Sequence, residues 1–78
     1  MTEIEFNYKG QKTIIQIKNN DKIKEAFSKV ATKIGKSLDS IYFIYGGNPI
    51  NEESTFLDLA NNEDKERNKM SILINEYI

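Results

Sequence analysis

Residues 22–35, KIKEAFSKVATKIG, carry the strongest structural pattern in this chain of 78 residues. Asn20 or Asp21 suits the helix N-cap, because a short side-chain oxygen can accept a hydrogen bond from a free backbone N–H. Gly35 suits the position after the helix, because glycine readily adopts a positive φ. The apolar residues of this segment recur at helical spacing and form one stripe, which predicts an amphipathic helix that packs by a single face. The apolar residues at helical spacing are Ile23, Ala26, Phe27, Val30, Ala31 and Ile34.

The residues before this helix predict a β-hairpin. Apolar and polar residues alternate in the run EIEFNY, and Gly10 lies in the turn that follows. Thr13, Ile15 and Ile17 continue the pattern after the turn. Alternation with a period of two is typical of a half-buried strand. If Tyr8 pairs with Gln11, Ile4 lies opposite Ile15, and the apolar residues of both strands share one face.

The residues after the helix predict several short elements. The order of the expected strands and helices along the chain indicates an α+β fold in which one helix packs across one face of a sheet. We expect residues 1–78 to form a single domain. The expected elements are a strand at 41–45 closed by Gly46 and Gly47, a short strand near Ile50, a small helix at 56–59, a solvated loop at 61–69 and a last strand at 70–74.

The composition excludes several classes of function. Cysteine and histidine are both absent, so disulfides, thiol chemistry and the usual zinc sites are not expected. The serines have no histidine to activate them, and we expect no enzyme activity, no cofactor and no metal. The net charge of −1 argues against broad nucleic-acid binding. No run is long enough to cross a membrane and no signal peptide is expected. We therefore expect a cytoplasmic or nuclear binding module.

The strand at 41–45 is apolar on both of its faces. One helix can cover only one face of the sheet. If Ile41 and Phe43 pack on the helix, Tyr42 and Ile44 face solvent on the other side, and Leu73 of the last strand joins them. Contiguous exposed apolar patches usually mark a contact surface. This pattern predicts a binding surface on the open face of the sheet.

The chain resembles ubiquitin and the ubiquitin-like domains over essentially its whole length. The match runs without a gap from Lys12 to Leu59, and the 61–69 segment is longer here. The resemblance implies a β-grasp fold, with a mixed four- to five-stranded sheet and one helix packed across it. The positions that carry the resemblance are Ile23, Val30, Gly35, Asp39, Ile44, Gly47, Ile50, Thr55 and Asp58.

The resemblance also implies a recognition surface centred on Ile44. Its partners would be ubiquitin receptors, the proteasome or other factors of the ubiquitin pathway, bound by a monomer. Tyr42 would extend the surface and suit an anchor role, because tyrosine joins a large rigid body to a polar tip. The expected surface comprises Tyr8, Tyr42, Ile44, Gly47, Ser71 and Leu73.

Two departures from the family affect the functional hypotheses. The printed sequence ends Asn75-Glu76-Tyr77-Ile78 rather than in the Gly-Gly used for conjugation. Asn48 occupies the position of the family's commonest chain-linking lysine. Lys29 and Lys33 match family lysines and are possible modification sites.

Three functions remain open from the sequence. The first is an interaction module excised from a larger protein or polyprotein. The second is a protein modifier attached without Gly-Gly, through autoprocessing of a flanking intein-like domain. The third is a small-GTPase-binding β-grasp domain that pairs through the second strand, near Lys12 and Lys18. The helix lysines Lys22, Lys29, Lys33 and Lys36 are interpreted as a solvated face rather than a dock for an acidic partner.

Overall fold

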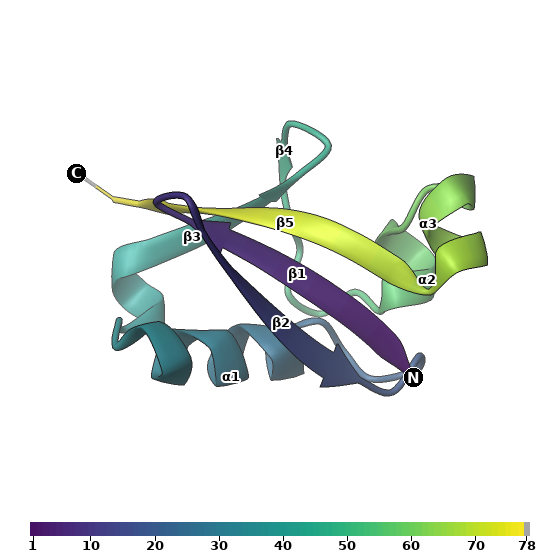
Figure 1. The fold of residues 1–78 in the computed structure, drawn as a ribbon, viewed down its shortest axis with the longest axis horizontal. Helices are drawn as coiled ribbons and strands as arrows, with labels where there is room; N and C mark the ends of the chain where they lie inside the picture. The colour runs from purple at the N-terminus through teal and green to yellow at the C-terminus, as the bar shows by residue number, and fades with distance from the viewer. Residues whose placement is uncertain (78) are drawn as a thin grey trace.

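The computed structural model describes residues 1–77 and shows a five-stranded mixed sheet with the order β2-β1-β5-β3-β4 (Figure 1). β1 and β5 are parallel, and the other neighbouring strands are antiparallel. The elements are β1 (Thr2–Tyr8), β2 (Gln11–Ile17), α1 (Lys24–Ile34), the 3-10 turn η1 (Leu38–Ser40), β3 (Ile41–Tyr45), β4 (Asn48–Pro49), α2 (Phe56–Leu59), α3 (Asn62–Arg67) and β5 (Lys69–Glu76).

α1 packs across one face of this sheet, which gives the α+β fold and the ubiquitin-like, β-grasp topology that the sequence predicts (Figure 1). Ile78, the last residue of the expected domain, lies outside the described residues. Within residues 1–77, no helix has the length and apolar character needed to cross a membrane.

The β1–β2 hairpin has the predicted register. Tyr8 pairs with Gln11, and Ile4 pairs with Ile15. The turn consists of Lys9 with φ 50° and Gly10 with φ 81°. Two consecutive positive φ angles define the tight hairpin turn whose twist matches that of the strands. Ile4, Phe6, Ile15 and Ile17 therefore lie together on the helix side of the sheet, whereas Ile14 is exposed and pairs with Glu5.

An aromatic cluster joins α1 to the sheet. The rings of Phe27 and Phe43 stack with centroids 3.7 Å apart and planes 5° apart. Phe6 meets Phe43 edge-on, with centroids 5.7 Å apart. All three side chains are buried. The prediction that the odd-numbered residues of β3 pack on the helix is confirmed.

The predicted N-cap of α1 is wrong. Neither Asn20 nor Asp21 caps the helix, and the N-cap residue is Ile23, which has no side-chain cap. Backbone carbonyls replace the missing side-chain cap. The N–H of Ile23 donates to the carbonyl of Ser54 at 2.7 Å, and the N–H of Lys24 donates to the carbonyl of Glu52 at 3.1 Å. At the other end, Gly35 takes the predicted left-handed conformation, with φ 71°.

The predicted loop at 61–69 is also wrong, because residues 62–67 form α3. The side chain of Asn61 accepts a hydrogen bond from the N–H of Asp64 at 2.9 Å and so caps the helix. The small helix at 56–59 and the strand at 41–45 are confirmed, whereas the short strand lies at Asn48–Pro49, just before Ile50. β5 is longer than predicted at both ends.

Replacing Phe27 with alanine should strongly destabilise the protein. Phe27→Ala removes the stacked ring and leaves a cavity, so we expect the free energy of unfolding to fall by about 3–5 kcal/mol. Urea unfolding measures this change, with an unaltered m-value as the sign that both states are otherwise preserved. Leu57→Ala is the matched control, because Leu57 is 52% exposed and its loss should change little. Equal effects of both variants would contradict this description of the core.

Candidate functional site

Ile44 of β3 and Leu73 of β5 form the centre of the candidate site. They are direct partners in the antiparallel β3–β5 ladder, so their side chains share one face of the sheet. Leu73 is 44% exposed, and Ile44 is half-buried. A shallow hollow of about 320 Å³ surrounds them, lined by Asn7, Ile44, Gly46, Gly47, Ser71, Ile72 and Leu73. We call Ile44, Gly47, Ser71 and Leu73 the open-face patch.

Strand alternation explains why these side chains face away from α1. In β5, Met70, Ile72 and Ile74 are buried against the helix side, whereas Leu73 is exposed on the opposite side. The exposed leucine cannot turn inward without moving its buried neighbours out of the core. The burial of the β5 core therefore fixes Leu73 on the open face.

The turn between β3 and β4 places glycine beside the patch. Gly46 and Gly47 have φ values of 60° and 83°, and Tyr45 pairs with Asn48 across them. Positive φ at both positions favours glycine, and the turn reverses the chain within two residues. This geometry keeps bulky side chains away from one edge of the hollow.

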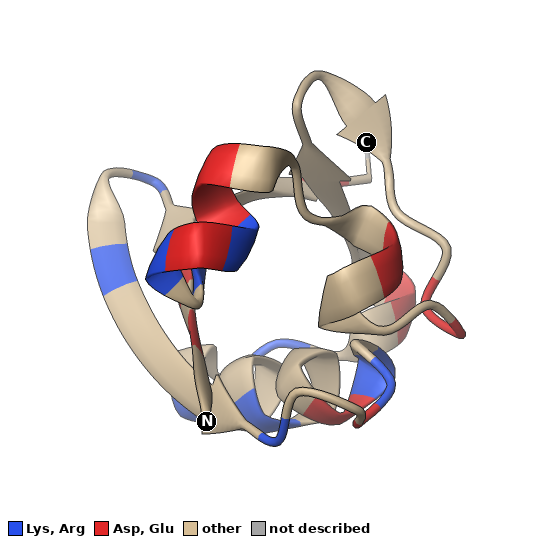
Figure 2. Cartoon of the chain, turned by 90° about the vertical axis from the view of Figure 1, so that its right-hand side faces the viewer, with Lys and Arg blue, Asp and Glu red and all other residues tan. Residues whose placement is uncertain are grey.

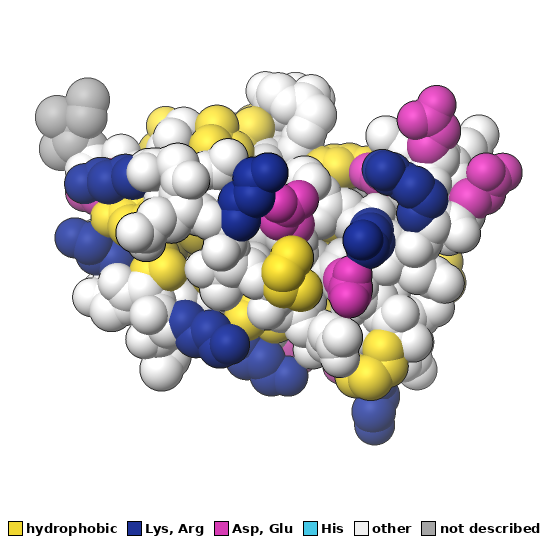
Figure 3. Space-filling view, in the orientation of Figure 1, with side chains coloured by type: hydrophobic (Ala, Val, Ile, Leu, Met, Phe, Trp, Pro, Cys, Tyr) yellow, Lys and Arg dark blue, Asp and Glu magenta, His cyan; other side chains and the backbone are white. Residues whose placement is uncertain are grey.

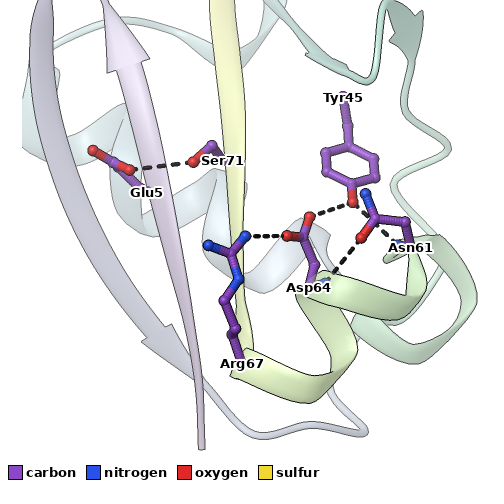
Figure 4. Close-up of polar contacts among 6 residues, drawn as sticks. All are labelled: Glu5, Tyr45, Asn61, Asp64, Arg67 and Ser71. Carbon is purple, nitrogen blue, oxygen red and sulfur yellow. Dashed lines mark hydrogen bonds and ion pairs between the residues drawn. The ribbon is translucent and has the colours of Figure 1, made fainter.

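The β1 side of the patch is polar. The hydroxyl of Ser71 donates to a carboxylate oxygen of Glu5 at 3.2 Å (Figure 4). Glu5 also pairs with Lys12, with 3.5 Å between the ammonium nitrogen and the carboxylate oxygen. In Figure 3, hydrophobic side chains on the visible face lie in separate groups with charged side chains between them. The open-face patch therefore has polar side chains along its β1 side.

Tyr42 lies on the same face, farther along β3. It pairs with Asn75 in the ladder, and its ring lies 4.9 Å from the ring of Tyr77, measured between centroids. The two rings make an aromatic extension of the open face toward the end of β5. The predicted position of Tyr42 on this face agrees with the structure.

Tyr8 does not join the open-face patch, so the structure corrects this part of the predicted surface. Tyr8 has the same strand parity as Ile4 and Phe6, and it packs at the border of the core on the helix side. Its hydroxyl donates to the carboxylate of Glu76. The β1 residue that lines the hollow is its neighbour Asn7. The alternation of β1 was the signal that could have placed Tyr8 correctly.

Glu76 connects the end of β5 to the hairpin. Besides Tyr8, it meets Lys9, whose ammonium nitrogen lies 3.0 Å from the carboxylate. The hydrogen bond from Tyr8 and the contact with Lys9 lower the pKa of Glu76 below its ordinary value of 4.5. One residue farther on, the N–H of Tyr77 donates to the carbonyl of Ser40 at 3.0 Å. These contacts hold residues 76 and 77 against the body of the domain.

Glu76→Gln should lower stability at neutral pH and have no effect in strong acid. A carboxyl group with a lowered folded-state pKa stabilises the fold above its unfolded pKa, and this contribution is lost as the pH falls through the folded-state pKa. Urea unfolding of both proteins at several pH values measures the difference. Glu66→Gln on α3 is the control. If the two proteins still differ in their free energy of unfolding at a pH below the pKa of Glu76, the carboxylate charge is not the cause of the difference.

A polar network holds α3 against β3 (Figure 4). The hydroxyl of Tyr45 donates to Asp64 at 2.5 Å and accepts from the N–H of Asn61 at 3.1 Å. Asp64 also receives a hydrogen bond from Arg67 at 2.5 Å. Asp64 is buried, and the network supplies partners for its carboxylate. Sequence reasoning missed this cluster, although the Asn61-x-x-Asp64 spacing is typical of a helix start.

The phenol of Tyr45 should ionise at a higher pH than an ordinary tyrosine. Burial and the hydrogen bond to Asp64 raise the pKa of Tyr45 above 10.0, because both disfavour the charged phenolate. The wild-type fold therefore loses stability as the pH rises past the unfolded value and through this raised pKa. Tyrosinate absorbance during an alkaline titration measures the effect. Tyr45→Phe should remove a phenol that ionises above pH 10.0, and an unchanged titration curve above that pH would contradict this.

Lys29 and Lys33, the two predicted modification sites, are exposed on α1. They do not line the hollow around Ile44. Within the described part of the chain, no three Asp or Glu side chains are grouped so as to hold a metal ion. Every buried polar side-chain atom within residues 1–77 has a hydrogen-bond partner. The chemistry that the open-face patch offers is apolar contact with a polar rim.

No model of a known protein family matches the sequence, and no curated protein matches it. The topology and the placement of Ile44 and Leu73 are therefore the features from which a function can be argued. They define the class as a domain of β-grasp, ubiquitin-like topology with an apolar patch on the open face of its sheet.

Proposed function

We propose that the chain is a non-catalytic, ubiquitin-like interaction domain that presents the open-face patch to ubiquitin-binding partners. Ubiquitin receptors and proteasome subunits are the partner class. The observation that carries the proposal is the direct pairing of Ile44 with Leu73 on the uncovered face of the sheet. A leucine that is 44% exposed in this position gains from being covered by a partner.

The size of the patch sets the expected strength of binding. The hollow is shallow, and charged side chains lie close to it on β1. Such a surface buries less than the roughly 1,600 Å² of a standard protein interface. We therefore expect weak and reversible binding, with Ile44 and Leu73 as the anchors and Tyr42 at the margin.

Alanine variants of the two anchors test this proposal. Ile44→Ala and Leu73→Ala should each weaken binding to isolated ubiquitin-binding domains by about tenfold, which corresponds to about 1.4 kcal/mol. NMR titration with a panel of such domains measures the affinity and shows which amide signals move. The loss of apolar area at the contact is the physical reason for the effect.

The matched control is Leu57→Ala, which truncates an exposed leucine of α2 outside the patch. This variant should bind as the wild type does. A domain that binds Ile44→Ala and Leu73→Ala with full affinity would contradict the proposal. Retained binding of a small GTPase by Ile44→Ala, without binding of any ubiquitin-binding domain, would favour the second-strand alternative instead.

A further inference from the structure

A second hollow lies beside the first residues of β3. β4 pairs only with Ile44 and Tyr45, so the earlier residues of β3 have β5 on one side and no strand on the other side within the described sheet. The hollow occupies this gap, where η1 and residues 49–52 border it, and its volume is about 260 Å³. We call it the β3-edge pocket. Its lining includes Phe27, Leu38, Tyr42, Phe43, Glu52 and Tyr77.

Four of the lining side chains are aromatic. The ring of Tyr77 is 63% exposed, and it lies 4.9 Å from the ring of Tyr42, with the two planes 38° apart. The N–H of Tyr77 donates to the carbonyl of Ser40, which holds this residue against the start of β3. The stacked rings of Phe27 and Phe43 are buried at the base of the pocket. The faces of aromatic rings carry partial negative charge and attract cations.

Glu52 supplies a carboxylate to the same pocket. It is exposed, and none of the ion pairs within residues 1–77 involves it. Lys24 contacts Glu52 through its backbone N–H, but its ammonium nitrogen lies 3.0 Å from the carboxylate of Glu53. The carboxylate of Glu52 is therefore free to bind a cation from outside the chain.

The surroundings of Glu52 are also acidic. Residues 39–76 contain eight acidic and three basic residues, and the basic ones lie on α3 and at the start of β5. Figure 2 shows acidic positions on the loop that follows β4 and on α2. The net charge of −1 conceals this local excess. A cation that approaches the pocket from the side of Glu52 meets a negative potential.

We propose that the β3-edge pocket binds the guanidinium group of an arginine side chain from a partner protein. The planar group stacks on the rings of Tyr42 and Tyr77 and donates hydrogen bonds to the carboxylate of Glu52. Ile44 and Leu73 do not line this pocket. The proposal therefore goes beyond the open-face patch and does not depend on it.

The size and chemistry of the pocket select this ligand over other occupants. A volume of about 260 Å³ is below the roughly 300–1,000 Å³ of most small-molecule sites, so the pocket suits one side chain better than a cofactor. The ammonium of lysine is strongly hydrated, whereas guanidinium is weakly hydrated and stacks on aromatic faces. An apolar side chain would take the carboxylate of Glu52 out of water without giving it a partner.

Small amides test the proposal directly. The probe is N-acetyl-arginine amide, and the control is the citrulline amide, which has nearly the same shape but no charge. NMR titration of the protein measures both affinities. We expect weak but saturable shifts of the amide signals of Tyr42, Ile50 and Tyr77. The citrulline amide should bind about fivefold more weakly, because it lacks the attraction to the carboxylate and the rings.

Matched variants locate the contact. Glu52→Gln should weaken binding of the arginine amide about fivefold, whereas Glu63→Gln makes the same charge change on α3 and should have little effect. Tyr77→Leu keeps an apolar side chain but removes the ring, and it should weaken binding severalfold. Tyr77→Phe keeps the ring and should bind as the wild type does. Ile44→Ala should also have little effect, which separates this site from the open-face patch.

Several results would overturn the proposal. Equal affinities for the arginine and citrulline amides would show that charge has no role, and equal effects of Glu52→Gln and Glu63→Gln would exclude the carboxylate. Tighter binding of trimethyl-lysine amide than of arginine amide would assign the pocket to a quaternary ammonium group instead. Shifts confined to the amides of Ile44 and Leu73 would place the probe on the open-face patch.

Discussion

The sheet has two faces, but the one long helix, α1, covers only one of them. The rest of the structure depends on this difference between the two faces. Only the side of the sheet that meets α1 can be dry, so β1, β3 and β5 alternate between buried residues and residues that are half-buried or exposed. The parallel pair at the centre aligns Phe6 with Ile72 and Ile4 with Met70, which stacks the core residues into one layer. The aromatic contact between Phe27 and this layer then holds the helix in place. The exposed residues of the same strands are left to form a surface.

The elements that burial decides could be predicted from sequence. The register of the hairpin, the apolar stripe of α1 and the two faces of β3 follow from alternation or helical spacing. α3 could not be predicted in this way, because all six of its residues, NEDKER, are polar. Its side-chain hydrogen bond to β3 comes from Tyr45, which is distant in the sequence. The start of α1 is similar, because its N–H groups are satisfied by the backbone of residues 52–54.

The candidate site shows the same division. The position of Ile44 and Leu73 on the open face could be predicted, because the neighbouring residues of each strand are apolar core residues that face the helix. The family resemblance puts Tyr8 on this surface, whereas its strand parity ties it to Phe6 on the helix side. The sequence predicts that Lys29 and Lys33 lie on an exposed face of α1, but it does not show that they lie next to β2.

The position of β5 has a consequence for the synthesis of the protein. β5 lies between β1 and β3, yet its residues 69–76 follow all the other strands in the chain. Until the ribosome has released residues 69–76, no strand joins the β1–β2 hairpin to β3. The apolar stripe of α1 can then pack against only part of the sheet. Pairing of residue 3 with residue 69 also requires closure of a long loop, which slows folding relative to local contacts. A nascent chain would therefore expose its apolar residues until the last strand emerges, and this interval is when chaperones would meet it.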